Sequence, residues 1–221
     1  MGVHRGGRSR LGPRLAALGA ALAVTVSACG SSNPDVVTYR DPDRHSLFEL
    51  PTEWNLYEGD QLTQVSIPFV IQGQDFQLPV ISQMAFDGAP DSDPDNVGNS
   101  VSTSSFPIGA VTVREIGPDE RDFMSRFLLA ELVVPYHSQL GSEEILKQDF
   151  VFDNDFRGVQ LAIAYTDSVT EAEAAVYLIS VTDPNVTRMY SIAVGCSLDC
   201  FSTHQEDIVA VVDSYLVNTR G

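Results

Sequence analysis

The sequence predicts an α+β domain in which a mostly antiparallel sheet packs against two main helices. Short β-rich segments recur between residues 46 and 194 and are separated by turns rich in Pro, Gly, Asn and Asp. Apolar residues at three- and four-residue spacing mark two helices, one after Pro118 and one near the end of the chain. An apolar content of 43% with a mean hydropathy near zero is typical of a globular domain.

The leader of the chain has the layout of a secretory signal peptide. Arg5, Arg8, Arg10 and Arg14 precede a short apolar run that ends in small residues before Cys29. This run is too short to cross a hydrocarbon core of about 30 Å as a helix. We therefore expect a signal peptide over residues 1–28, a lipidated cysteine with a flexible tether over 29–35, and a single domain over 36–221.

The end of the leader, Val26-Ser27-Ala28-Cys29, resembles the bacterial lipobox. In that motif a peptidase cuts before a cysteine whose thiol has received a diacylglyceryl group. The resemblance implies a lipoprotein that begins at Cys29, carries fatty acids such as palmitate, and lies on the extracytoplasmic face of the cell membrane. The protein would be attached to the membrane through the diacylglyceryl group on Cys29.

The charge of the chain limits its partners. There are 13 Lys and Arg against 30 Asp and Glu, and four of the arginines lie in the leader. So acidic a domain repels nucleic acid and anionic lipid headgroups. We expect no nucleic acid partner. Solubility outside the cell explains the acidity most simply, and a basic partner or bound cations are the alternatives.

The first strands are predicted around a proline corner. Residues 46–50 are apolar and aromatic enough for a strand, Pro51 breaks it, and residues 54–58 form a second strand that starts with Trp54 as a core anchor. Further strands are expected at 62–71, 77–86 and 110–116, with a turn at 73–75 and a long polar loop at 87–105. Pro68 and Pro79 each remove a ladder donor, which places the first two of these strands at an edge or at a bulge.

The first main helix is predicted after Pro118-Asp119-Glu120, an acidic start that favours the helix dipole. Its buried stripe is expected to contain Phe123, Phe127, Ala130 and Val134, and Met124 and Leu128 widen it. Pro135 limits the end of the helix.

The second half is predicted as a four-strand meander and a closing helix. The strands are expected at 144–152, 156–165, 175–182 and 188–194. Ser202 or Thr203 would cap the helix, with Gln205 or Glu206 completing a capping box. Its apolar stripe contains Ile208, Val211, Val212, Tyr215 and Leu216.

Cys196 and Cys200 form an even pair in a chain with an export signal. Residues four apart in a turn bring their Cα atoms within disulfide range, so we expect a disulfide. A redox pair usually has two intervening residues, and a metal site needs further cysteines or histidines nearby.

Both ends of the domain resemble those of PsbP-like domains. Residues 39–59 are similar to the opening of those domains, in which a strand leads into a Leu-Pro-x-x-Trp corner. The strand at 189–195, the cysteine pair and a closing helix that ends at 213–217 are similar to actinobacterial secreted lipoproteins of the LpqN-like kind. The resemblance implies a PsbP-like α/β/α sandwich and supplies no catalytic residues. Better known relatives assist protein assemblies.

Motifs of enzymes are missing from the sequence. There is no Gly-x-Ser-x-Gly elbow, phosphate-binding glycine loop or His-Glu-x-x-His helix. His45, His137 and His204 lie in different predicted elements without metal-ligand spacing. We therefore expect no enzyme, no catalytic residue and no cofactor.

The long loop contains one candidate for a cation site. Asp91, Asp93 and Asp95 have the one-three-five spacing of calcium loops. Asn96 stands where such loops need Gly, and Ser102 where they need a bidentate Glu. A solvated acidic loop is therefore the preferred interpretation, and a docking surface for a basic partner remains open.

The sequence favours a non-enzymatic binding or assembly module of the cell envelope whose partner is an unknown envelope protein. The alternative is a carrier of a lipid or other apolar ligand, and an envelope hydrolase ranks below both. An interaction module predicts an exposed apolar or acidic patch, whereas a carrier predicts an apolar cavity.

Replacement of the lipidation residue tests the location. In a Cys29→Ala variant the diacylglyceryl mass should be absent, because no thiol remains to accept it. Mass spectrometry of the protein expressed with its own leader measures this. Persistence of that mass would disprove the lipoprotein assignment.

Overall fold

The computed structural model describes residues 35–41, 46–62, 69–71, 74–76, 78–97, 100–135, 137, 139–151 and 155–217. All of these belong to one compact unit, Asn33–Gly221. The expected signal peptide, Cys29 and His45 lie outside the described residues.

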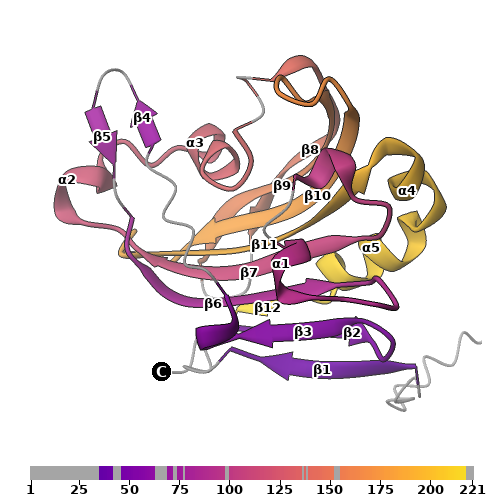
Figure 1. Cartoon of the computed structure of the whole chain (residues 1–221). Coiled ribbons are helices and arrows are strands. Elements are labelled where there is room, and N and C mark those ends of the chain that lie inside the picture. The colour runs from indigo at the N-terminus through magenta and orange to yellow at the C-terminus, as the bar shows by residue number, and fades with distance from the viewer. Residues whose placement is uncertain are drawn as a thin grey trace, which may run out of the picture. The chain divides into compact units, whose positions relative to one another are not determined.

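Seven strands in the described part of the chain form one antiparallel sheet in the order β3-β6-β7-β11-β10-β9-β8 (Figure 1). Their bounds are β3 Asn55–Glu58, β6 Val80–Asp87, β7 Ile108–Glu115, β8 Leu140–Val151, β9 Arg157–Thr166, β10 Glu173–Thr182 and β11 Arg188–Ser197.

A smaller antiparallel sheet has the order β1-β2-β12, and β4 pairs with β5 as a hairpin. The bounds are β1 Val36–Arg40, β2 Ser46–Pro51, β12 Leu216–Val217, β4 Phe69–Ile71 and β5 Gln74–Phe76. The helical elements are η1 Gly59–Gln61, α1 Pro94–Val97, η2 Val101–Thr103, α2 Pro118–Arg121, α3 Arg126–Glu131, α4 Leu198–Thr203 and α5 Gln205–Asp213.

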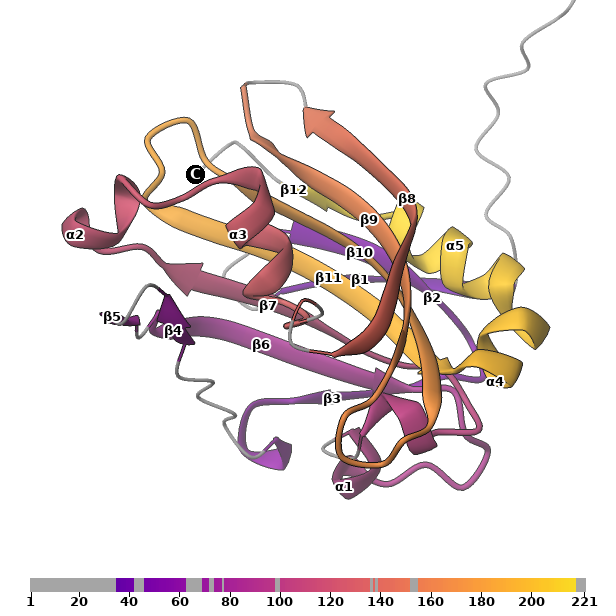
Figure 2. The ribbon, with the colours of Figure 1, turned by 90° about the horizontal axis from the view of Figure 1, so that it is seen from above.

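The alternating side chains of β10 separate two hydrophobic cores. Ala175, Tyr177 and Ile179 belong to the core that contains α5, whereas Val176 and Leu178 belong to the core that contains α3. Successive side chains of a strand point to opposite faces of the sheet, so α3 and α5 cover opposite faces. Figure 2 shows α3 and α5 with the strands of the sheet between them. The predicted α+β class with a mostly antiparallel sheet is confirmed.

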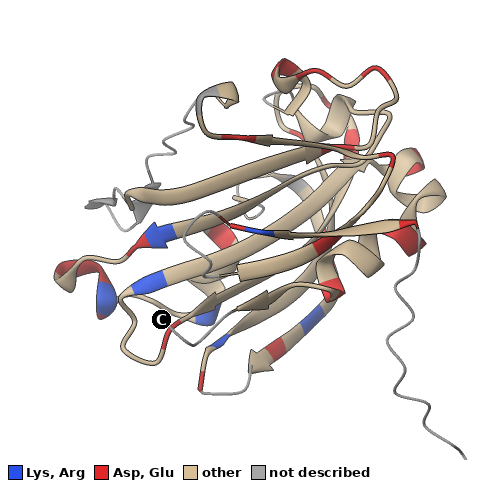
Figure 3. Cartoon of the chain, turned by 90° about the horizontal axis from the view of Figure 1, so that it is seen from below, with Lys and Arg blue, Asp and Glu red and all other residues tan. Residues whose placement is uncertain are grey.

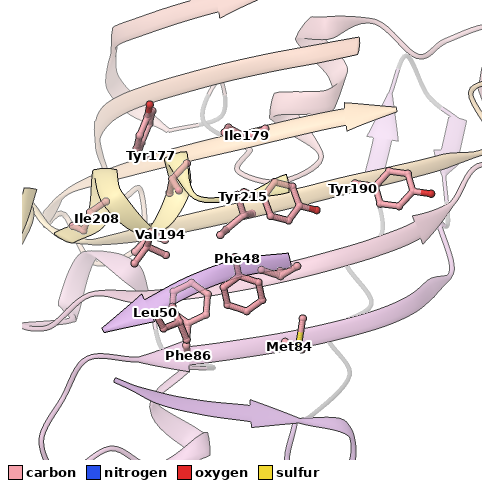
Figure 4. Close-up of a cluster of buried hydrophobic side chains, with 14 of the residues drawn as sticks. Phe48, Leu50, Met84, Phe86, Tyr177, Ile179, Tyr190, Val194, Ile208 and Tyr215 are labelled. Atoms are coloured by element: carbon pink, nitrogen blue, oxygen red, sulfur yellow. The ribbon is translucent and has the colours of Figure 1, made fainter. Parts of the chain in front are cut away.

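The core on the α5 side joins the two sheets. Phe48 of β2 and Phe86 of β6 are fully buried with Ile208 and Tyr215 (Figure 4). Trp54 stacks near Phe86, with 5.9 Å between the ring centroids. The prediction of Trp54 as a core anchor is therefore confirmed.

The helix predicted after Pro118 is divided into α2 and α3. Ser125 is the N-cap of α3, and its side chain accepts a hydrogen bond from the Leu128 amide at 3.2 Å. This new start changes the buried face. Phe123 and Phe127 are 43% and 47% exposed, so their predicted burial is wrong. Ala130 and Leu128 are buried as predicted, and Leu129 and Leu132, which were not predicted, are buried beside them.

The closing helix begins differently from the prediction. The N-cap of α5 is His204 and makes no side-chain capping bond, so the predicted capping box is wrong. Ser202 and Thr203 instead donate to carbonyl oxygens inside α4, of Leu198 and Asp199. The predicted stripe is confirmed except at its end: Ile208, Val211, Val212 and Tyr215 are buried, and Leu216 is exposed.

The predicted disulfide between Cys196 and Cys200 is confirmed, with 5.8 Å between the Cα atoms. Cys196 lies in β11 and Cys200 in α4, and both are buried. The bond therefore fixes the junction between the sheet and the helix that follows it.

The predicted strands at both sides of Gly73 need one correction. Gln74 and Asp75 were expected in a turn but belong to β5, which pairs with β4 rather than with the large sheet. The bulge predicted beside Pro79 is confirmed. Pro79 precedes β6, and the pairing of β6 with β7 changes register between Val80 and Ser82. Pro68 lies outside the described residues.

The strand β8 is an edge of the large sheet. Its side chains are mostly exposed, and Val151 is 63% exposed. The pairing of β8 with β9 changes register between Leu140 and Glu143 and again between Glu144 and Leu146. No helix among the described residues is long and apolar enough to span a membrane.

A glycine in β9 is required by the close approach of its neighbour. A Cβ at Gly158 would lie 1.9 Å from the backbone oxygen of Ser180 in β10. Because backbone atoms within a paired ladder cannot move aside, a Gly158→Ala variant should lose about 2 kcal/mol of unfolding free energy. Denaturant unfolding measures the loss. Ser142→Ala on exposed β8 is the control and should unfold like the wild type.

Candidate functional site

An apolar pocket of about 250 Å³ lies at the end of the large sheet where β7 begins and β11 ends. Its floor is formed by Ile108, Gly109 and Ala110 of β7 and Ala193, Val194 and Gly195 of β11, with Tyr165 and Val176 beside them. Val97, Val101, Val133, Val134 and Pro135 complete the lining and come from α1, η2 and the segment after α3.

The floor is hollow because its strands carry small residues there. Ala193 pairs with Ala110, and Val194 pairs with Gly109. A Cβ at Gly195 would lie 2.6 Å from the Val176 side chain and 3.0 Å from that of Val101. The sequence therefore keeps side-chain volume low where two strands meet the loops.

Hydrogen bonds hold the η2 segment over this end of the sheet. Ser100 Oγ donates to Asp167 Oδ2 at 3.0 Å, and the hydroxyls of Ser102 and Thr170 are 2.8 Å apart. The Ser197 amide donates to the Ser104 carbonyl at 3.0 Å. The lining residue Val101 is therefore fixed from both sides.

Asp167 stays ionised in this arrangement. Its Oδ1 accepts the backbone amides of Val169 and Thr170 at 2.8 and 2.9 Å. These amides, followed by the Ser100 and Thr170 side chains, lower the pKa of Asp167 to about 2 because they stabilise the carboxylate. The turn between β9 and β10 thus holds a negative charge two residues from Tyr165.

Asp87 organises the long polar loop from within. It is buried and accepts hydrogen bonds from the Ala89 amide at 2.8 Å, Ser92 Oγ at 3.0 Å and Asn96 Nδ2 at 3.3 Å. A polar hollow of about 290 Å³ adjoins it, lined by Asp87, Ala89, Asp91, Asn96, Thr103, Ser104, Ser105 and Phe106. The donors to Asp87 are thus internal to the loop.

The three residues of the calcium candidate do not converge. Asp91, Asp93 and Asp95 are exposed, and Asp93 Oδ1 accepts the Asp95 amide at 2.9 Å, which forms a local turn. Within the part of the chain that the structure describes, no three His, Cys, Asp or Glu side chains are placed to hold a metal ion.

Neither of the two described histidines, His137 and His204, lies in the lining of the apolar pocket. The His137 ring lies against Phe127, with 4.4 Å between centroids, and its Nδ1 contacts the Glu131 carboxylate. The His204 ring centroid lies 6.3 Å from that of Phe106. The structure therefore brings neither of them into the apolar pocket.

Carboxylates gather at this end of the sheet, and no described Lys or Arg lies between them; all of these carboxylates are exposed except that of Asp167, which is half-buried. We call them the acidic rim: Asp91, Asp93, Asp95, Asp167, Glu171, Glu173 and Asp199. The described Lys and Arg residues lie on other segments: at the far ends of β7, β9 and β11, midway along β8, and in β1, α2 and α3. These are Arg40, Arg114, Arg121, Arg126, Lys147, Arg157 and Arg188. Figure 3 shows how Lys and Arg are distributed over the chain.

The sequence interpretation found the acidic loop but missed the apolar pocket. Its visible traces are Val97 and Val101 in a polar loop, the valines before Pro135, and small residues in two strands. None of these signals is specific, because valine and alanine are common inside any domain.

No protein-family model matches the sequence, and no curated protein resembles it. Three solved structures are similar in chain path. The cyanobacterial PsbP (CyanoP) of Synechocystis sp. PCC 6803 is 14% identical with a TM-score of 0.49, covering 87% of this chain and 99% of that chain. The Ran-binding protein Mog1p of Saccharomyces cerevisiae is 7% identical with a TM-score of 0.46, covering 82% and 95%. The Pseudomonas aeruginosa protein PA94, of unknown function, is 10% identical with a TM-score of 0.38, covering 63% and 88%.

The low pKa of Asp167 predicts a pH-dependent stability difference. The ordinary value is 3.8 and the folded value is about 2, so the carboxylate stabilises the fold above about pH 4. This contribution is lost as the pH falls from about 4 to 2. An Asp167→Asn variant should be less stable than the wild type at pH 6, and the gap should narrow toward pH 3.

Urea unfolding at pH 6, 4 and 3 measures this gap. Ser100→Ala removes one donor and keeps the carboxylate, so its gap should follow the same trend with smaller amplitude. A constant gap for Asp167→Asn across this range would contradict the assigned pKa.

Proposed function

We propose that this chain is a lipid-anchored extracytoplasmic lipoprotein whose domain is a non-enzymatic binding or assembly module of the cell envelope. The lipobox-like ending at Cys29 supports the location. The resemblance of residues 39–59 and of the C-terminal segment to PsbP-like domains of the LpqN-like kind supports the class of lipoprotein. The observation that carries the binding role is the apolar pocket.

The pocket is available to an apolar group because it cannot easily close. Water against an apolar lining costs about 25 cal/mol per Å² relative to burial. The floor is already built from small residues of a paired ladder, and hydrogen bonds to Asp167 and Thr170 hold the η2 cover. An entering apolar group therefore gains burial without a large rearrangement.

The volume favours a partner's side chain over a whole lipid. Pockets for drug-sized molecules measure about 300–1,000 Å³. The present pocket, at about 250 Å³, is smaller and suits one or two apolar side chains of a docking protein. This comparison supports the interaction module more than the carrier.

The lining also supports a binding role rather than a catalytic one. Tyr165 is the ionisable residue among the described lining residues. Burial, followed by the charge of Asp167, raises the pKa of its hydroxyl. A neutral phenol of this kind suits hydrogen bonding better than proton abstraction at neutral pH.

A carrier of a lipid or other apolar ligand is the second candidate. Most of the residues that line the pocket are apolar, which favours a carrier because an acyl chain needs no polar partner. Only part of a chain would fit within about 250 Å³, so a carried lipid would protrude from the pocket.

Filling the pocket tests both candidates. In an Ala193→Phe variant the ring should occupy the pocket, because Ala193 lies on its floor. Native mass spectrometry of the mature protein, crosslinked in its own membranes and extracted gently, reports what is bound. We expect a protein partner on the wild type and a loss of about tenfold or more in the variant.

Val37→Phe on exposed β1 is the matched control and should retain the partner. A lipid beyond the covalent anchor, present on the wild type and absent from Ala193→Phe, would favour the carrier. Retention of every companion by a folded Ala193→Phe variant would rule out the pocket as the binding site.

A further inference from the structure

We propose that the occupant of the apolar pocket is a cationic amphipathic segment of a protein. One apolar side chain of the segment enters the pocket, and Lys or Arg residues beside it face the acidic rim. This inference rests on the proposed binding role of the same pocket and names the chemistry of the partner.

Segments that line the pocket also carry rim carboxylates. Asp95 and the lining residue Val97 share α1, and Asp167 lies two residues after Tyr165, just past the end of β9. Glu173 begins β10, which contributes Val176 to the lining. The apolar pocket and these carboxylates therefore lie at the same end of the sheet.

Among the described residues, no neighbouring Lys or Arg balances the charge of the rim. In the described chain Lys147 lies midway along the edge strand β8, where it pairs with Leu161 of β9. Arg157 and Arg188 lie at the opposite ends of β9 and β11. Like charges that face one another across loops repel, so a cationic partner lowers the electrostatic energy of this end.

The rim carboxylates divide into two roles. The oxygens of Asp167 already accept amide and hydroxyl donors, so this residue supplies a fixed negative field. Asp95, Glu171 and Glu173 are exposed and can form ion pairs directly. The same carboxylates repel anionic lipid headgroups, which disfavours a lipid surface as the partner.

Binding of a defined peptide tests the inference. The probe is a blocked, fluorescent peptide of the sequence Lys-Lys-Leu-Phe-Leu-Lys-Lys, and the protein is the full lipidated chain in phosphatidylcholine nanodiscs. Anisotropy should show saturable binding that weakens as salt rises, because salt screens exposed charges. Peptides with Glu for every Lys, or with Ser for Leu and Phe, should bind at least about tenfold more weakly.

Two variants of equal net charge separate the rim from the overall charge. The rim variant combines Asp95→Asn, Glu171→Gln and Glu173→Gln. Its control combines Glu49→Gln, Glu115→Gln and Asp119→Asn, which neutralise exposed carboxylates in β2, at the opposite end of β7 and in α2. The rim variant should lose about tenfold in affinity, as expected for three exposed ion pairs, and the control should stay within about twofold.

Ala193→Phe should abolish binding of the peptide. Equal losses in the two charge variants would show general attraction by an acidic protein and would overturn the inference. Binding blocked by Ala193→Phe but unchanged in the rim variant would overturn it too, while leaving the pocket as a binding site. Absence of peptide binding up to about 1 mM would overturn this inference but not the proposed binding role of the pocket. The membrane crosslinking experiment tests that role separately.

Discussion

Burial of one strand from two sides is the constraint on which the domain depends. β10 contributes alternate residues to both cores, so neither α3 nor α5 could be removed without exposing half of it. Its neighbours β9 and β11 pair along its whole length and share that burial. Position and orientation of the helices then follow from which face of β10 they cover.

The pocket arises where this constraint relaxes. Toward the end of the sheet, β11 carries the small residues Ala193 and Gly195, and neither α3 nor α5 contributes to the lining of the pocket. The cover is supplied instead by η2 and by the segment after α3, and Val97 of α1 is part of it. Polar contacts of Asp167 and Thr170 hold η2 in place together with packing of Val101 against the core. The hollow is therefore a property of the loops as much as of the sheet.

Alternation and turn residues were enough to predict the meander, and the spacing of Cys196 and Cys200 was enough to predict their bond. The predicted helix stripe was right at Leu128 and Ala130 and wrong at Phe123 and Phe127. The two phenylalanines have the right period, but the helix starts again at Ser125 and leaves them exposed. The predicted N-cap of α5 was wrong because Ser202 and Thr203 belong to α4, where their hydroxyls donate to backbone carbonyls. The pocket could not be predicted, since it depends on small residues from distant segments meeting at one end of the sheet.

The edge strand β8 affects whether copies of this domain can pair with one another through their sheets. Two changes of register interrupt its pairing with β9. It also carries four charged residues: Glu143, Glu144, Lys147 and Asp149. A strand of this kind is a poor template for adding a strand of another molecule. Contact between neighbouring copies through a continuous sheet is thereby discouraged, and selective contact is left to the loops.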